Sequence, residues 1–207
     1  MKKYITSAIR IIFLGLFLFL IARGKMMLWL GLFATSLLAA LIFGRVYCGY
    51  ACPMNTLMIP TEWISKKLKL QSSKKPKWLK SGKFAWFSLI GSIALMLVFR
   101  IVLDKNIPIL LIWLGIAVLL TLRYKPAVFH NLICPFGPLQ RAFGRFAIFS
   151  EKVDENCIGC KKCEKVCPSE AIVVNADKKA KIETSLCFQC TNCVQVCPVN
   201  SIHYIKR

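Results

Sequence analysis

The chain has 207 residues, which is room for one medium domain or two small ones. Its 57% hydrophobic content and mean hydropathy of +0.57 are too high for an ordinary soluble protein. The net charge of +20 lies almost entirely before residue 150, where Glu62 and Asp104 are the only acids. Because this basic excess stands beside long apolar runs, it indicates a membrane protein with positive cytoplasmic segments that contact anionic lipid, and no nucleic-acid partner.

Two apolar runs open the chain, from about Tyr4 to Ala22 and from Met26 to Gly44, with a short basic turn between them. Each is long enough to cross the hydrocarbon core as a helix. A basic start followed by an apolar run also fits a cleavable signal peptide, but no small-residue cleavage site follows and the second run begins at once. We therefore expect a retained transmembrane hairpin, with Arg10 reaching toward the cytoplasmic headgroups.

A second pair of apolar runs, Phe84–Leu103 and Pro108–Leu122, is expected to form another hairpin with an external turn at Asp104–Asn106. Between the two hairpins lies a basic loop whose lysines place it in the cytoplasm. An interfacial helix is expected over residues 140–150. The sequence thus predicts four transmembrane helices in two tandem hairpins. The lysines of the basic loop are Lys66, Lys67, Lys69, Lys74, Lys75, Lys77, Lys80 and Lys83.

Each hairpin leaves the membrane through a similar motif: C-G-Y-A-C-P at residues 48–53, the first exit, and H-N-L-I-C-P at residues 130–135, the second exit. Positions i and i+4 share a helix face, so Cys48 with Cys52, and His130 with Cys134, can each offer two ligands to one centre. A third iron–sulfur cluster, a structural zinc and unligated thiols that pack as small apolar residues all fit this pattern. His130 could instead be a proton-coupled group near a quinone, or a plain substitution without a role.

The most specific pattern lies after residue 150, where C-x-x-C-x-x-C-x-x-x-C-P occurs twice. This spacing wraps a loop around a cubane iron–sulfur cluster, and the fourth cysteine of each run binds the other cluster. Zinc sites usually separate two C-x-x-C pairs by a longer gap, and disulfides need an oxidising compartment, so both alternatives are disfavoured. We assign one [4Fe-4S] cluster to Cys157, Cys160, Cys163 and Cys197, and a second to Cys187, Cys190, Cys193 and Cys167.

With these eight ligands, residues 150–205 resemble the bacterial two-cluster ferredoxins. The whole chain resembles the membrane polyferredoxins of the periplasmic nitrate reductase quinol-dehydrogenase type, on the C-x-x-x-C-P motif at Cys48 and the C-P-F-G-P-L-Q run at Cys134. His130 stands where that family usually has cysteine. The resemblance implies an α-helical integral membrane domain over residues 1–149 and an α+β two-cluster ferredoxin domain over residues 150–207. It also implies a bacterial or archaeal cytoplasmic membrane, with the termini and the ferredoxin domain in the cytoplasm.

We therefore expect a membrane-anchored carrier that passes electrons between a cytoplasmic donor and a membrane partner bearing quinol, flavin or haem. Other redox proteins, or subunits of an oxidoreductase complex, would be its partners. No dinucleotide fingerprint or Ser–His–Asp set occurs, so no stand-alone catalytic site is expected. The alternative is an assembly or regulatory factor that supplies electrons for maturation of a metalloenzyme. His203 is expected on the surface of a closing strand and has no assigned role.

Overall fold

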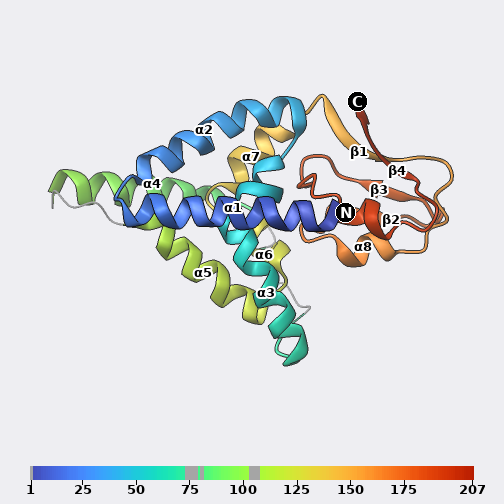
Figure 1. Cartoon of the computed structure of the whole chain (residues 1–207), viewed down its shortest axis with the longest axis horizontal. Coiled ribbons are helices and arrows are strands. Elements are labelled where there is room, and N and C mark those ends of the chain that lie inside the picture. Colours follow the sequence, from blue (N-terminus) through green and yellow to red (C-terminus); the bar gives the residue numbers. More distant parts are fainter. Residues whose placement is uncertain (1, 73–78, 80–81, 103–107) are drawn as a thin grey trace. The chain divides into compact units, whose positions relative to one another are not determined.

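The computed structural model describes residues 2–72, 79, 82–102 and 108–207. The expected turn at 104–106, and Lys74, Lys75, Lys77 and Lys80 of the basic loop, lie outside the described residues. The chain forms two compact units: residues 1–52 together with 139–207, and residues 53–138. Figure 1 labels most helices and strands of both units.

The first unit begins with a helical hairpin of α1 (Lys2–Ala22) and α2 (Met26–Phe43), which packs on a short π-helix, η1 (Tyr47–Ala51). Aromatic side chains hold these three elements together. The Trp29 indole donates a hydrogen bond to the Tyr47 hydroxyl at 3.0 Å, and the rings of Phe17 and Phe33 meet this pair edge-on. The start of the first exit is therefore fixed on the hairpin.

The same unit contains the C-terminal region, which has two small antiparallel sheets and two short helices (Figure 1). Its core is small and consists of Cys163, Ile172, Ala180, Cys193 and Ile202. The closing strand expected around His203 is confirmed, since β4 contains this exposed residue. The elements are β1 (Phe149–Val153) paired with β4 (Ile202–Lys206), β2 (Ile172–Val174) paired with β3 (Ala180–Ile182), α8 (Lys162–Val166) and α9 (Asn192–Val196).

The helix expected over residues 140–150 is wrong at its C-terminal end. Helix α7 (Gly137–Gly144) stops early, and strand β1 begins at Phe149. The backbone amide of Ile148 donates to the carbonyl of Leu41, and Phe149 stacks between the rings of Phe43 and Tyr204. Apolar residues spaced for an amphipathic helix also suit a strand, and here pairing with β4 decides the outcome.

The described part of the second unit contains helices α3 (Pro53–Lys67), α4 (Phe84–Val102), α5 (Ile109–Arg123) and α6 (Pro126–Leu132). Helix α3 packs along α5, and the Ser65 hydroxyl donates to the Leu122 carbonyl at 2.6 Å. Helix α3 was not predicted, because its residues were assigned to the basic loop. Two signals favoured it: Pro53 at the first helical position and the Glu62–Lys66 ion pair at i,i+4 spacing, 2.7 Å long.

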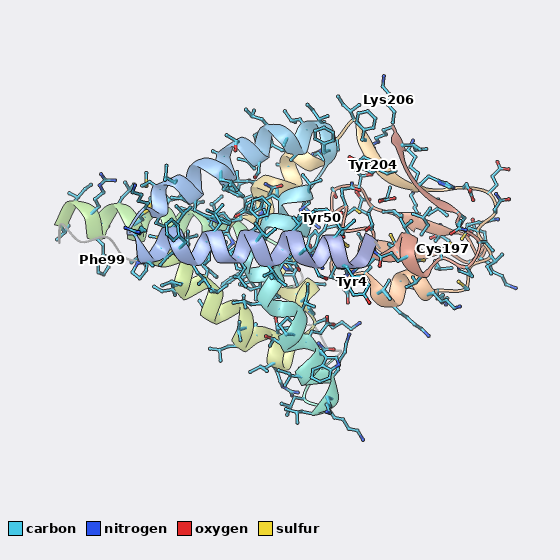
Figure 2. All side chains as sticks on the ribbon, in the orientation of Figure 1. Tyr4, Tyr50, Phe99, Cys197, Tyr204 and Lys206 are labelled. Atoms are coloured by element: carbon cyan, nitrogen blue, oxygen red, sulfur yellow. The ribbon has the colours of Figure 1, made fainter. Side chains whose placement is uncertain are left out.

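Among the residues that the structure describes, three helices are long and apolar enough to cross a membrane: Tyr4–Ala22, Met26–Phe43 and Phe84–Val102. Helix α5 is apolar but has only 15 residues. Large apolar side chains of these helices, such as Ile12, Leu28 and Phe87, are more than half exposed. Figure 2 shows many side chains that project outward from the helices. An apolar surface of this extent is unusual in water and is typical of helices that contact lipid.

Candidate functional site

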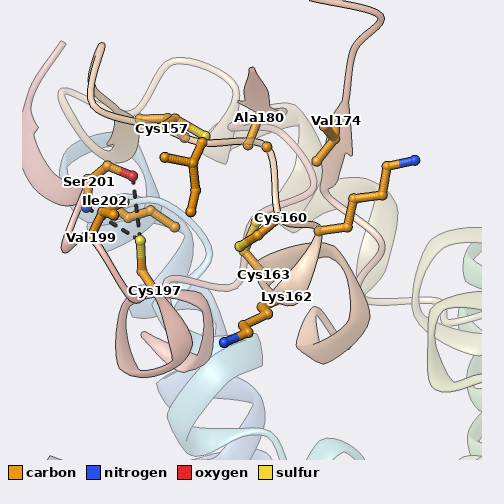
Figure 3. A pocket seen from close by; sticks show the side chains of 14 residues that line it. Cys157, Cys160, Lys162, Cys163, Val174, Ala180, Cys197, Val199, Ser201 and Ile202 are labelled. Atoms are coloured by element: carbon orange, nitrogen blue, oxygen red, sulfur yellow. Dashed lines mark hydrogen bonds between the residues drawn. The ribbon is translucent and has the colours of Figure 1, made fainter. Parts of the chain in front are cut away.

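The eight cysteines between residues 157 and 197 line two separate cavities, four in each. In each cavity three cysteines come from one loop and the fourth comes from the end of the other repeat. Figure 3 shows the first cavity, into which Val199 and Ile202 also project. The first cavity is lined by Cys157, Cys160, Cys163 and Cys197, and the second by Cys187, Cys190, Cys193 and Cys167.

The two cysteine loops have matching backbone conformations. Gly159 and Lys161, on either side of Cys160, have φ angles of 65° and 60°. Gln189 and Thr191, on either side of Cys190, have φ angles of 55° and 58°. Left-handed residues in tight turns are the setting in which backbone amides form anion-binding concavities. Both loops therefore suit a negatively charged group.

The fourth cysteine of each repeat also has matching contacts. The backbone amide of Ala171 donates to the Cys167 sulfur at 3.3 Å, and that of Ser201 donates to the Cys197 sulfur at 3.4 Å. Figure 3 shows the Cys197 contact. Hydrogen bonds from amides to a thiolate sulfur stabilise its negative charge and tune the potential of a bound cluster.

Burial distinguishes the thiols of the two cavities. Cys160 in the first loop is exposed, whereas Cys187, Cys190 and Cys193 in the second are all buried. Burial raises the pKa of Cys187 to about 12 and also raises the pKa of Cys190 and Cys193. Burial also acts to raise the pKa of Cys197, but hydrogen bonds from Ser201 outweigh it and the net pKa is lowered. Iron binds thiolates, so the buried thiols must lose their protons when metal binds.

The donor set fits a [4Fe-4S] cluster in each cavity. Within residues 149–207, all of which the structure describes, no three His, Cys, Asp or Glu side chains converge closely enough to hold a single metal ion. A cubane spreads four thiolates over four irons. The four cysteines that line each cavity match this number of ligands.

The first exit is docked on the second cysteine loop, residues 187–193. The Tyr50 hydroxyl donates to the Gln189 carbonyl at 3.0 Å. The backbone of Gly49 lies so close to the Phe188 carbonyl oxygen that a methyl group on Gly49 would clash with it. From α1, the guanidinium Nε of Arg10 donates to the Gly49 carbonyl at 2.8 Å. The peptide between Cys48 and Cys52 thus contacts the peptide between Cys187 and Cys190.

Arg45 lies at the same junction and is only 1% exposed. Its Nη2 contacts the sulfur of Cys48 at 3.7 Å, and its Nη1 donates to the Ser185 carbonyl at 3.4 Å. Its guanidinium carbon is 4.9 Å from the centre of the Phe188 ring. The side chain therefore contacts both the exit cysteine and the second cysteine loop.

The four exit residues are all buried, but they do not lie along regular helices as expected. Cys48 is in η1 and Cys52 is the extended residue after it; His130 is in α6 and Cys134 follows that helix. The prediction that the two residues of each exit share one helical face is wrong. In each exit the cysteine at position i+4 precedes a proline, and a residue before proline disfavours the helical conformation. Cys48 and Cys52 belong to the first unit, and His130 and Cys134 to the second.

The sequence analysis missed the residues that dock the first exit: Arg45, Gly49, Tyr50, Phe188 and Gln189. One usable signal was the glycine beside Cys48, because glycine often marks a close backbone approach. A second was an arginine three residues before a candidate ligand.

Replacing Gly49 with alanine is expected to lower the free energy of unfolding of the first unit by about 1–3 kcal/mol, because the new methyl group must displace the Phe188 carbonyl. Gly31→Ala in α2 is the matched control, because no atom lies within 4 Å of the added methyl group. Thermal unfolding in detergent, followed by amide hydrogen exchange, measures both. A Gly49→Ala variant as stable as Gly31→Ala would refute the tight contact.

Comparison with known protein families identifies the class. Residues 151–204 match the 4Fe-4S dicluster domain family, and residues 26–71 and 106–153 match the 4Fe-4S binding domain family. The chain therefore carries 4Fe-4S ferredoxin-type domains, with a helical part that contains apolar helices followed by a C-terminal ferredoxin region.

Individual relatives support the same class. An uncharacterized protein of Methanocaldococcus jannaschii is 32% identical over 74% of this chain and 63% of its own length. The methylamine utilization ferredoxin-type protein MauN of Paracoccus denitrificans is 28% identical over 72% of this chain and 56% of its own. The putative electron transport protein YccM of Escherichia coli is 25% identical over 75% and 49%. The chain spans between about half and two thirds of these relatives. No solved structure matches it.

Proposed function

We propose that this protein is a membrane-anchored iron–sulfur electron carrier that binds two [4Fe-4S] clusters. The observation that supports this most is the pair of cavities, each lined by four cysteines in a crossed arrangement. When bound, a cubane gains and loses one electron at a potential set by burial and hydrogen bonds. The chain supplies the thiolates, the amides of Ala171 and Ser201 that donate to two of them, and apolar walls that exclude water.

Residues 1–149 would form the membrane domain, with α1, α2, α4 and α5 as its four spans. Helix α5 has only 15 residues, so it would span the hydrocarbon core only if its neighbours tilt or the bilayer is locally thin. The lysines between α3 and α4 favour a cytoplasmic basic loop, and hence a cytoplasmic ferredoxin domain over residues 150–207. Anionic lipid headgroups are the chemistry that this loop would meet.

The two exits would hold a third iron–sulfur centre with Cys48, Cys52, Cys134 and His130 as ligands. Both exits fall within segments that match the 4Fe-4S binding domain family, and all four side chains are at most 5% exposed. A histidine ligand in place of cysteine raises the potential of a cluster. Docking of the first exit on the second cysteine loop would place Cys48 within reach of the ferredoxin region.

The proposed role is to carry electrons between a cytoplasmic donor and a membrane partner bearing quinol, flavin or haem, as in polyferredoxins of the quinol-dehydrogenase type. The names of MauN and YccM favour an electron carrier over an assembly factor. A stable complex with dehydrogenase or reductase subunits would fit a carrier, whereas transient contact with a maturation apparatus would fit an assembly factor.

Anaerobically purified protein is expected to contain more than about eight irons, of which two cubanes account for eight. In a reductive titration followed by electron paramagnetic resonance, the variant Cys48→Ala/Cys134→Ala should lose the excess iron and a third signal while both ferredoxin signals remain. Cys163→Ala is the control, because it should lose ferredoxin iron and keep the third signal. Wild-type protein without cubane signals would refute the function, and a double variant with wild-type iron would refute the third centre alone.

A further inference from the structure

Arg45 is a buried positive charge that has no carboxylate partner among the described residues. Its Nε makes no hydrogen bond within the described part of the chain. Burying a cation without a compensating anion is strongly unfavourable. The surroundings of this guanidinium are therefore expected to contain a negative charge other than a side-chain carboxylate.

An orienting role in the membrane does not explain this position. Basic residues that orient helices lie at the headgroups, where lipid phosphates and water solvate them. Arg23, at the end of α1, is exposed in this way, whereas Arg45 is 1% exposed. Arg10 is also buried, but its Nε is used by the Gly49 carbonyl. Of these two buried arginines, Arg45 is the one whose Nε makes no hydrogen bond within the described residues.

Arg45 is in direct contact with one candidate iron-binding thiol and with the second cysteine loop. On one side it contacts the sulfur of Cys48. On the other side it contacts Ser185 and Phe188, which lie just before and between the cysteines of the second loop. The side chain is held in place, since a methyl group at Gly144 would come within 2.9 Å of its Cγ. The guanidinium is therefore fixed between the exit thiol and this loop.

The geometry points to Arg45 as the counter-charge of the centre held by Cys167, Cys187, Cys190 and Cys193, shared with the thiolate of Cys48. This inference rests on the proposed function. Accepting one electron from an external reductant adds one negative charge to that centre and none to Arg45, so the guanidinium stabilises the reduced form more than the oxidised form. Arg45 is a positioning and tuning residue that raises the midpoint potential of the second site relative to the first.

The test is an anaerobic potentiometric titration with dithionite on the full-length protein, followed by electron paramagnetic resonance. The signal that disappears in Cys190→Ala reports the second site. Arg45→Gln should lower the midpoint potential of this signal by at least about 59 mV, which is a tenfold change in the equilibrium constant of a one-electron reduction. The other ferredoxin signal should stay at its wild-type potential. Arg45→Lys keeps the charge and should shift less. Arg23→Gln removes the same charge from an exposed position of the same unit and should shift neither signal.

The proposal is overturned if Arg45→Gln keeps both wild-type potentials, or if Arg23→Gln produces an equal shift. If the Arg45→Gln variant loses its iron, the Arg45→Lys variant decides whether the charge or the packing of Arg45 is required. Iron and potential retained by the lysine variant support a role of charge, and their loss shows that packing alone requires the arginine. Wild-type protein that lacks both cubane signals would refute the proposed function, which is a different outcome from unshifted potentials in protein that holds its clusters.

Discussion

Removal of iron is expected to unfold residues 149–207 while α1 and α2 remain helical. One hydrophobic core cluster of this region has five buried residues, two of them cysteines, and the strands are three to five residues long. Helices α8 and α9 have five residues each, too few to be stable without tertiary contacts. So small a core cannot offset the entropy of ordering the chain, and binding of the metal must provide the remaining stability.

Hydrogen exchange measured by mass spectrometry tests this expectation on protein stripped of iron under chelation and oxidation. Amide protection in β1 and β4 should fall by at least about a hundredfold, which corresponds to about 3 kcal/mol. Peptides from α2 serve as the internal control and should keep their protection. Anaerobic addition of iron and sulfide should restore β1 and β4. Persistent protection of these strands in iron-free protein would show that the polypeptide alone stabilises the fold.

Alanine substitutions of the cysteines are expected to sort by cavity and not by position in the sequence. Cys163→Ala and Cys197→Ala should remove the same spectroscopic signal, because both residues line the first cavity. Cys167→Ala should instead match Cys187→Ala, because both line the second cavity. Each variant should retain about four of the eight ferredoxin irons. Iron quantitation and electron paramagnetic resonance of the four variants provide the measurement.

The informative comparison is between Cys163 and Cys167, which are four residues apart in the same motif. Both lie in the same motif of the same unit, so general damage to that motif would affect them alike. If the two variants lose the same signal, each motif binds its own cluster and the crossed assignment is wrong. Alanine is preferred to serine because a serine oxygen can still bind iron.

The sequence predicted the features that depend on local patterns. Apolar runs predicted the bounds of α1, α2, α4 and α5 to within a few residues, because a helix that crosses hydrocarbon needs little beyond length and composition. The spacing of Cys157, Cys160 and Cys163 predicted a cysteine loop, because ligands close in sequence must lie close in space. The crossed lining of the cavities agrees with the assignment made from the repeat.

The sequence did not predict features that depend on distant segments. Tyr50 and Gln189 are 139 residues apart, and no periodicity connects them. Their contact requires the backbone of Gly49 to approach the Phe188 carbonyl, which only three-dimensional packing reveals. The missed helix α3 has a different cause: its lysines suggested a solvated loop, although lysine is also a good helix former.

The crossed lining of the two cavities sets an order for biosynthesis. A ribosome releases Cys157, Cys160 and Cys163 well before Cys197, the fourth residue that lines their cavity. The second cavity is likewise incomplete until Cys187, Cys190 and Cys193 have been translated, after Cys167. Neither set of four thiols exists until both motifs have been translated, and strand β1 has no partner until β4 follows. Under the proposed function, iron and sulfide would therefore be delivered only after both motifs have been translated, by which time α1 and α2 have already been made.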